Sequence, residues 1–261
     1  MAISFKQKPG IVVYLTAGDP DIETTYDIAL AALDNGAEVL ELGVPFSDPL
    51  ADGPVIQRAS ERAVARGVRL TDVLELAKKI RAARPEAGIV IFSYLNPVVR
   101  VGMAEFCKLA KEHGADGVLL TDMIVEEAEE YLREMKKNDL APVFLAAPTS
   151  PDERLKAIAE HSRGFVYAIS RVGITGTQQN LESDAERLVK AIKQFTTLPV
   201  AVGFGVSNAE HVAAVGKFAD AAIIGSAIVK LIEDTPRDQA AEAVGKFVKG
   251  LRGPGRRQPI E

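Results

Sequence analysis

Residues 199–210 read Pro-Val-Ala-Val-Gly-Phe-Gly-Val-Ser-Asn-Ala-Glu, and they contain a pattern that recurs through the whole chain. The run from Pro199 to Gly203 is apolar without polar alternation, which is typical of a strand covered on both faces in a parallel sheet. The segment from Ser207 to Glu210 resembles a capping box and predicts the start of a helix. A strand, a glycine-containing loop and a helix follow one another, which indicates an α/β protein.

The same unit can be followed along the rest of the chain. Short runs rich in Val, Ile and Leu predict eight strands, at Ile11–Leu15, Glu38–Leu42, Ile89–Ser93, Gly117–Thr121, Pro142–Ala146, Gly164–Ile169, Pro199–Gly203 and Ala221–Gly225. Helical periodicity between them predicts helices at Ile22–Asn35, Thr71–Arg84, Met103–His113, Glu126–Asn138, Pro151–His161, Asp184–Thr196 and Asn208–Lys217. Eight strands followed by helices in 261 residues predict a single (β/α)8 TIM barrel.

The predicted barrel has one catalytic domain over residues 1–252, and residues 253–261 are expected to form a flexible tail. The long connection after the second strand is predicted to hold an additional helix, Val55–Arg66, before the main one. Residues 170–184 lack apolar periodicity and are expected to be a functional loop at the catalytic end of the barrel. An open doubly wound sheet is the alternative, but Leu15–Pro20 lacks the glycine fingerprint of that fold.

The composition is that of an ordinary cytoplasmic enzyme. The chain has 31 Lys and Arg against 36 Asp and Glu, a net charge of −5, and the two signs alternate along most predicted helices. This pattern disfavours a nucleic-acid partner. The apolar runs are too short to span a bilayer, and no signal peptide is recognisable, so no membrane association is expected. The only cysteine, Cys107, is expected to be a buried apolar residue.

Two kinds of chemistry lack suitable residues in this sequence. His113, His161 and His211 each lie in or at the end of a predicted helix, unpaired with one another or with cysteine, so no metal site is predicted. Every lysine is predicted to lie on a helix surface and none ends a strand, so a Schiff-base aldolase would lack its nucleophile. Carboxyl groups and phenols remain at the strand ends.

Glu41 is the first candidate for catalysis. It lies inside the apolar run Val39–Phe46, where loss of hydration is expected to raise its pKa. A glutamate with a raised pKa suits general acid/base work near neutral pH. A glutamate paired with a cation, or turned toward solvent at the sheet edge, is the structural alternative.

Asp52 and Tyr167 are the next candidates. Asp52 lies in Ser47–Pro54, a loop stiffened by prolines that could hold a carboxylate over the barrel mouth, although a turn aspartate fits the same pattern. Tyr167 lies within the sixth predicted strand. It fits a core position as readily as a substrate contact.

Glycine-containing loops after the last three predicted strands indicate a phosphate site. The residues are Gly176 after the sixth strand, Gly203 and Gly205 after the seventh, and Gly225 and Ser226 after the eighth. Glycines let backbone N–H groups approach an anion closely, and a helix N-terminus adds its dipole. Since the loops after strands 7 and 8 often bind phosphate in this fold, a phosphorylated substrate is expected.

These residues together resemble the α subunit of tryptophan synthase. The resemblance runs from about Ile11 to near the C-terminus, and the unusual stretch Glu41-Leu-Gly-Val-Pro-Phe-Ser-Asp-Pro-Leu-Ala-Asp-Gly-Pro54 makes it specific. The other motifs that carry it are Tyr14–Pro20, Asn96-Pro97, Ser170–Gly176, Gly203–Gly205 and Gly225-Ser226.

The resemblance implies retro-aldol cleavage of indole-3-glycerol phosphate to indole and glyceraldehyde 3-phosphate, with no cofactor in this chain. It implies that Glu41 is the general acid/base for the glycerol hydroxyl and the indole ring carbon. Asp52 would hold the indole N–H, and Tyr167 would assist nearby.

The resemblance also assigns the binding residues. Gly176, Gly205, Gly225 and Ser226 match the phosphate contacts of the family. Thr175 matches a threonine of the mobile sixth loop, which closes toward the catalytic aspartate.

A partner is implied as well. The family pairs with a β subunit that carries pyridoxal phosphate, in an α2β2 heterotetramer of tryptophan biosynthesis, and Pro45, Asp48 and Asn96 match the interface. The family usually has a helix that plugs the barrel floor before the first strand. Here about ten residues precede Ile11, with Phe5 as the sole large apolar candidate for that plug.

Two other functions fit the same motifs. A stand-alone lyase would release free indole without a partner. A catalytically silent barrel would bind the phosphorylated ligand and regulate another protein.

Overall fold

The apolar runs form one parallel sheet in the computed structural model, which describes residues 3–169, 178–203 and 205–252. The strands are β1 (Gly10–Thr16), β2 (Val39–Gly43), β3 (Gly88–Ser93), β4 (Gly117–Leu120), β5 (Ala141–Val143), β6 (Leu145–Ala146), β7 (Val166–Ile169), β8 (Val200–Gly203) and β9 (Ala221–Ile224). Their order in the sheet is β5-β4-β3-β2-β1-β9-β8-β7-β6. Neighbouring strands of the ring therefore follow one another in the chain, apart from the contact of β1 with β9.

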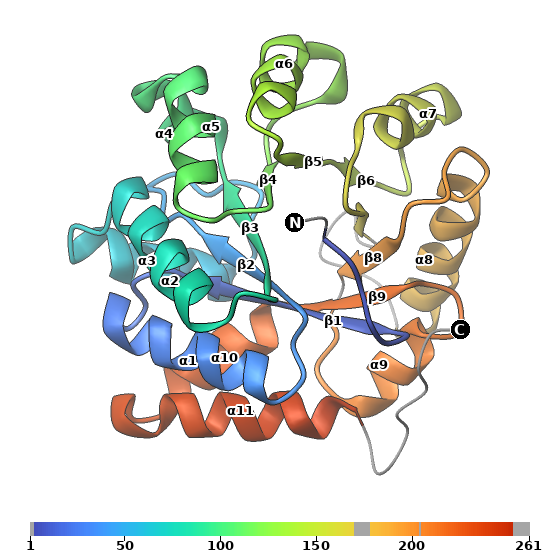
Figure 1. Ribbon diagram of the computed structural model, residues 1–261. Helices are drawn as coiled ribbons and strands as arrows, with labels where there is room; N and C mark the ends of the chain where they lie inside the picture. The colour runs from blue at the N-terminus through green and yellow to red at the C-terminus, as the bar shows by residue number, and fades with distance from the viewer. Residues whose placement is uncertain (1–2, 170–177, 204, 253–261) are drawn as a thin grey trace.

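The sheet closes through a strand that Phe144 divides in two. The fifth predicted strand, Pro142–Ala146, appears as β5, which pairs with β4, and β6, which pairs with β7. Because the chain passes directly from β5 to β6, the two ends of the sheet are joined by a single residue. The nine strands thus make the eight-membered ring that the sequence predicts, and the TIM barrel is confirmed (Figure 1).

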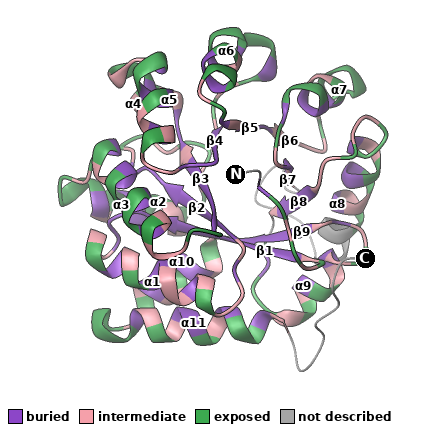
Figure 2. Cartoon of the chain, in the orientation of Figure 1, coloured by how far each residue is buried: buried purple, intermediate pink, exposed green. Residues whose placement is uncertain are grey.

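Helices surround the ring on its outer side, with their buried faces toward the strands (Figure 2). They are α1 (Ile22–Asp34), α2 (Pro54–Ala65), α3 (Leu70–Ala83), α4 (Leu95–Val101), α5 (Met103–Glu112), α6 (Glu129–Lys137), α7 (Asp152–His161), α8 (Gln178–Ile192), α9 (Ala209–Val215), α10 (Ser226–Asp234) and α11 (Ala240–Leu251). Single 3-10 turns stand at η1 (Val125–Glu127) and η2 (Arg237–Gln239). The connection after β2 contains α2 ahead of α3.

Side chains that accept hydrogen bonds from the backbone begin two of these helices. Asp21 Oδ1 accepts from the N–H of Thr24 at 2.9 Å and begins α1. Asn208 Oδ1 accepts from the N–H of His211 at 2.9 Å and begins α9, within the predicted capping segment. Such contacts satisfy backbone N–H groups that have no partner inside the helix.

Residues along each strand alternate between two cores. The interior of the barrel holds one cluster, which includes Val12, Val39, Val90, Leu119 and Val143. The intervening residues pack outward against the helices in a second, larger cluster. This period of two follows from strand geometry and decides which side chains reach the cavity inside the ring.

The N-terminal segment covers the floor of the barrel (Figure 1). Ile3 is buried and belongs to the interior cluster, and Phe5 packs against that cluster with its ring 6.0 Å from the ring of Phe165. The expectation that Phe5 is the sole large apolar candidate for the plug is therefore wrong, because Ile3 is the more deeply buried of the two. A β-carbon on Gly164 would lie 3.0 Å from Ile3, which shows how closely this segment fits.

Cys107 is fully buried in α5, and burial raises the pKa of its thiol to about 12. This confirms the expected role as an apolar core residue. None of the helices in the described part of the chain has the length and hydrophobicity of a membrane span.

Candidate active site

A cavity of about 590 Å³ opens at the carboxyl ends of the strands. Its lining includes most of the site residues that the sequence suggests, namely Glu41, Asp52, Tyr167, Gly203, Gly205, Gly225 and Ser226. Thr175 and Gly176 lie outside the described residues. The carboxyl end of the strands is where the catalytic sites of TIM barrels are found.

Glu41 points into the interior of the barrel from β2, beside Tyr14 of β1 in the strand register. Its side chain has no solvent exposure, and neither carboxyl oxygen has a hydrogen-bond partner among the described residues. Burial disfavours the charged form and raises the pKa of Glu41 to about 8. The carboxyl group is therefore predominantly protonated at neutral pH. The raised pKa of Glu41 agrees with the prediction from the sequence.

Glu41→Gln is expected to stabilise the fold more at alkaline than at acidic pH. Between the ordinary pKa of 4.5 and the folded-state pKa of about 8, the unfolded chain releases a proton that the folded chain keeps. The contribution of Glu41 to wild-type stability therefore falls as pH rises, by about 1 kcal/mol per pH unit within this range. Glutamine carries no such charge and avoids the loss.

Urea unfolding of both proteins at about pH 5 and about pH 8 measures this effect. The advantage of Glu41→Gln over the wild type should be larger at the higher pH. An equal difference at both pH values would contradict the protonated state of Glu41.

Asp52 is held over the same cavity by hydrogen bonds. Its Oδ2 accepts from Tyr94 Oη at 3.0 Å, and Tyr94 Oη itself accepts from the N–H of Ala51 at 2.9 Å. Gln57 of α2 donates to the backbone oxygen of Asp52 at 2.8 Å. Burial raises the pKa of Asp52 to about 6, although the hydrogen bond from Tyr94 lowers it in part. Asp52 is thus mainly ionised at neutral pH, whereas Glu41 is not.

Tyr167 faces the cavity from β7, and a glycine on the next strand makes room for it. A β-carbon on Gly203 would lie 2.5 Å from Tyr167 Oη, so a larger residue there would displace the phenol. Burial, together with the negative charge of Glu41 when ionised, raises the pKa of Tyr167 well above its ordinary value. The phenol therefore remains a neutral hydroxyl group that can donate a hydrogen bond.

Four of the predicted phosphate residues line the same cavity, namely Gly203, Gly205, Gly225 and Ser226. Ser226 is the first residue of α10, and Gly225 precedes it as the N-cap. The first N–H groups of a helix have no partner inside the helix, and the helix dipole favours an anion there. Gly205 has a φ of 38°, in the left-handed region that favours glycine.

Several lining residues were not singled out from the sequence for the site. They are Ile56, Phe92, Thr121, Leu145, Ile169, Val206, Ser207, Ile223 and Ala227. Phe92 packs edge-on against Tyr14, with the ring centroids 5.0 Å apart. The alternation along β3 would have identified Phe92, since it lies two residues after the interior residue Val90.

The residues predicted to meet a partner differ in exposure. Pro45 is buried by the chain itself, whereas Asp48 and Asn96 are exposed. The connections that follow β2, β3 and β4 also expose large apolar side chains, with Leu50 91%, Val99 59% and Ile124 44% accessible. These three side chains lie on connections at the carboxyl end of the strands, where the predicted partner contacts Asp48 and Asn96 also lie.

His113 makes contacts that hold it in the fold. His113 Nδ1 lies 2.7 Å from the backbone oxygen of Leu109, and His113 Nε2 lies 2.9 Å from a carboxyl oxygen of Glu75. The described residues contain no group of three or more His, Cys, Asp or Glu side chains arranged to hold a metal ion.

A closed parallel barrel with two differently protonated carboxyl groups and a helix N-terminus around one cavity is a TIM barrel of the enzyme type. Residues 2–251 match the family model described as tryptophan synthase alpha chain. The tryptophan synthase alpha chain of Cupriavidus pinatubonensis is 46% identical over 252 residues, which cover 96% of this chain and 95% of that relative. The chain therefore belongs to the tryptophan synthase alpha chain family, which implies a lyase activity.

Further relatives and solved structures agree with this assignment. The tryptophan synthase alpha chain of Neisseria meningitidis serogroup B is 47% identical over 242 residues, covering 93% of this chain and 92% of that relative. A chain of the tryptophan synthase a2b2 complex of Pyrococcus furiosus superposes with a TM-score of 0.87 at 40% identity, covering 95% and 100% of the two chains. The subunit alpha of Legionella pneumophila gives 0.86 at 36% identity, covering 94% and 91%.

Proposed function

We propose that this chain cleaves indole-3-glycerol phosphate by a retro-aldol reaction to indole and glyceraldehyde 3-phosphate, as the alpha subunit of a tryptophan synthase. One observation carries the proposal. Two carboxyl groups with different pKa values, about 8 for Glu41 and about 6 for Asp52, face one cavity. Groups whose environments separate their pKa values are suited to separate acid and base roles.

The proposed reaction begins with the protonated Glu41. Its proton passes to the ring carbon of indole that bears the glycerol chain, and the ring becomes cationic. The ionised Asp52 accepts a hydrogen bond from the indole N–H and stabilises that cation. The Glu41 carboxylate then takes the proton of the adjacent glycerol hydroxyl while the carbon–carbon bond breaks. The electrons of that bond return to the ring. Indole and the aldehyde are thereby formed, and Glu41 is protonated again.

The rest of the cavity suits the two ends of such a substrate. The N-terminus of α10, with Ser226 and the nearby Gly205, has the N–H groups and the dipole to hold a phosphate. Phe92, Leu145 and Tyr14 offer an apolar wall for an indole ring. The phosphate roles of Gly176 and Gly203 and the loop role of Thr175 remain predictions.

The proposed chemistry needs only proton transfers between carboxyl groups and substrate. It calls for no metal or organic cofactor in this chain, and pyridoxal phosphate is expected only in a β subunit. The exposed side chains of Leu50, Val99 and Ile124 support such a partner, together with the predicted contacts Asp48 and Asn96. Pro45 is buried, so its proposed role is to shape this loop and not to touch the partner.

Incubation of the purified chain with indole-3-glycerol phosphate tests the proposal. Indole and glyceraldehyde 3-phosphate should appear in equal amounts, slowly from the chain alone and faster after addition of a tryptophan synthase β subunit. Fast turnover without any gain from the partner would favour a stand-alone lyase. Binding without turnover in both conditions would favour a silent regulatory barrel and would defeat the proposed reaction.

A further inference from the structure

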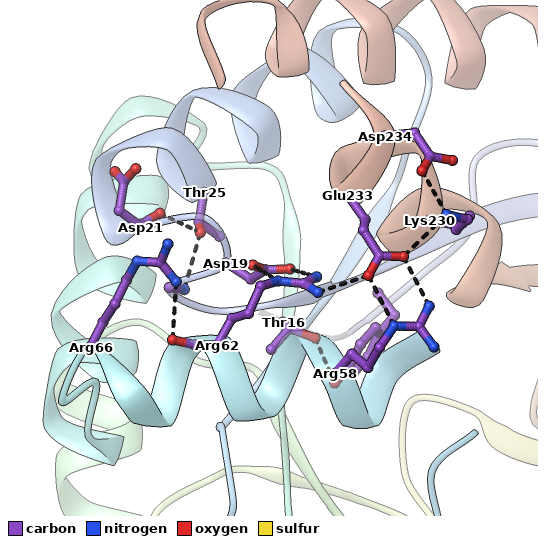
Figure 3. Close-up of polar contacts among 12 residues, drawn as sticks. Thr16, Asp19, Asp21, Thr25, Arg58, Arg62, Arg66, Lys230, Glu233 and Asp234 are labelled. Carbon is purple, nitrogen blue, oxygen red and sulfur yellow. Dashed lines mark hydrogen bonds and ion pairs between the residues drawn. The ribbon is translucent and has the colours of Figure 1, made fainter. Parts of the chain in front are cut away.

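A cluster of charged residues joins three elements next to the candidate site (Figure 3). We call it the Arg62 cluster, and its members are Asp19 from the loop after β1, Arg58 and Arg62 from α2, and Lys230 and Glu233 from α10. These segments are far apart in the sequence. They adjoin cavity residues: Tyr14 lies in the strand before the Asp19 loop, Asp52 lies just before α2, and Ser226 begins α10.

Arg62 lies at the centre of the cluster. Its Nε and Nη2 donate to the two carboxylate oxygens of Asp19 at 2.9 and 2.7 Å, and its Nη1 donates to Glu233 Oε1 at 2.8 Å. Asp19 is only 4% exposed, and its carboxylate pairs with this guanidinium. Paired hydrogen bonds between arginine and carboxylate fix both distance and orientation.

Glu233 receives two further cations. Arg58 Nε and Nη2 donate to its carboxylate oxygens at 3.0 and 2.9 Å, and Lys230 Nζ lies 3.2 Å from Oε2. The hydrogen bonds from Arg58 hold the pKa of Glu233 well below its ordinary range. Glu233 is therefore ionised at any pH at which the enzyme would work.

Helix α2 links the Arg62 cluster to the loop that contains Asp52. Gln57, next to Arg58, donates to the backbone oxygen of Asp52 at 2.8 Å. Ser60 Oγ accepts from the N–H of Phe46 at 2.8 Å and so holds the beginning of the same loop. A shift of α2 would consequently move the carboxylate of Asp52.

Helix α10 connects the cluster to the candidate phosphate site. Its first residue is Ser226, and Glu233 lies two turns further along the same helix. Between the two helices, Ala59 and Val229 are buried together over Tyr14. The ion pairs therefore flank an apolar contact, and α2 and α10 are held as one unit.

We propose that the Arg62 cluster is a positioning device that fixes the distance between Asp52 and the N-terminus of α10. A phosphorylated substrate anchored at α10 then presents its ring to a carboxylate at the correct distance. The inference rests on the proposed function for the role of Asp52. Misplacement by about 1 Å can cost about 100-fold in rate, so a device of this kind has a measurable effect.

Arg62→Lys tests the proposal, because lysine keeps the charge beside Asp19 but cannot bridge Asp19 and Glu233 with one planar group. With the β subunit present, kcat is expected to fall about tenfold with KM changed less than threefold. Glu233→Gln, which keeps the shape of the side chain, is expected to act in the same direction. The matched control is Arg84→Lys, which removes a paired contact with Asp34 outside the cavity and should leave kcat and KM within twofold.

A double-mutant cycle with Asp52→Asn separates positioning from general stability. If Arg62 acts through Asp52, Arg62→Lys should lower kcat by less than about twofold when Asp52 is already replaced. A full tenfold loss in that background, or no loss in the wild-type background, would overturn the inference. If Asp52→Asn itself leaves turnover unchanged, the role of Asp52 in the proposed function fails. The proposal that the Arg62 cluster positions Asp52 then fails as well.

Hydrogen exchange provides a readout that does not depend on the reaction. Amides of residues 47–53 should exchange faster in Arg62→Lys than in the wild type, and no faster in Arg84→Lys. Unchanged exchange would overturn the coupling of α2 to the Asp52 loop. Faster exchange in a chain that does not cleave the substrate would support the coupling and defeat only the proposed reaction.

Discussion

Replacing Glu41 with glutamine is expected to lower kcat by a factor of about 10²–10⁴, which is the range for loss of a general acid or base. Glutamine has nearly the same shape, so the cavity and the phosphate end should be kept, and KM should change by less than about threefold. The amide cannot give a proton to the indole ring or take one from the glycerol hydroxyl. Steady-state release of indole measures the effect.

Glu134→Gln is the matched control for this substitution. Glu134 is also a buried glutamate, 7% exposed, but it lies on α6 outside the cavity and pairs with Arg133 and Lys137. Its replacement should leave kcat within about twofold. Equal losses in the two variants would mean that any buried glutamate matters for folding and would remove Glu41 from the mechanism.

Replacing Asp52 with asparagine is expected to lower kcat by about 10²–10³, the range for loss of one preorganised electrostatic group. Asparagine can still accept a hydrogen bond from an indole N–H, but it has no negative charge for the cationic ring. The wild type should also lose kcat/KM as pH falls through about 6, because Asp52 becomes protonated there. This acid limb should be absent from Asp52→Asn.

Tyr94→Phe is the companion of this test, because the phenol hydrogen bond favours the charged form of Asp52. Without it the pKa of Asp52 should rise, and the acid limb of the pH profile should move to higher pH. Activity at about pH 8 should remain close to that of the wild type, since Asp52 is still ionised there. An unmoved acid limb in Tyr94→Phe would show that another group causes it.

The barrel could be predicted from the sequence, because strands that are buried on both faces appear as nearly continuous apolar runs. The runs around Val12 and Val90 are apolar throughout, the run around Val39 is apolar except for Glu41, and the spacing between runs has room for at least one helix each. The split of the fifth strand at Phe144 could not be read from the sequence. Each residue of this segment pairs with one of two neighbouring strands, and which one depends on the tilt of the strands in the closed ring. No local sequence pattern encodes that tilt.

The candidate site was predictable only where local chemistry is unusual. Glu41 stands out because burying a carboxyl group within an apolar strand costs free energy, which points to a functional role for that group. The role of Tyr94 could not be read from the sequence, because its contact with Asp52 joins two separate connections. The Arg62 cluster was not predicted for the same reason, since Asp19, Arg62 and Glu233 meet only in the folded chain.

The protonation state of Glu41 in the resting protein is the most direct test of the proposed chemistry. Infrared difference spectra between the wild type and Glu41→Gln, recorded as a function of pH, report it. At neutral pH the wild type should show the carbonyl band of a protonated carboxyl group that the variant lacks, and the band should disappear as pH rises through about 8. Absence of that band at neutral pH would mean that Glu41 rests as a carboxylate and cannot supply the first proton.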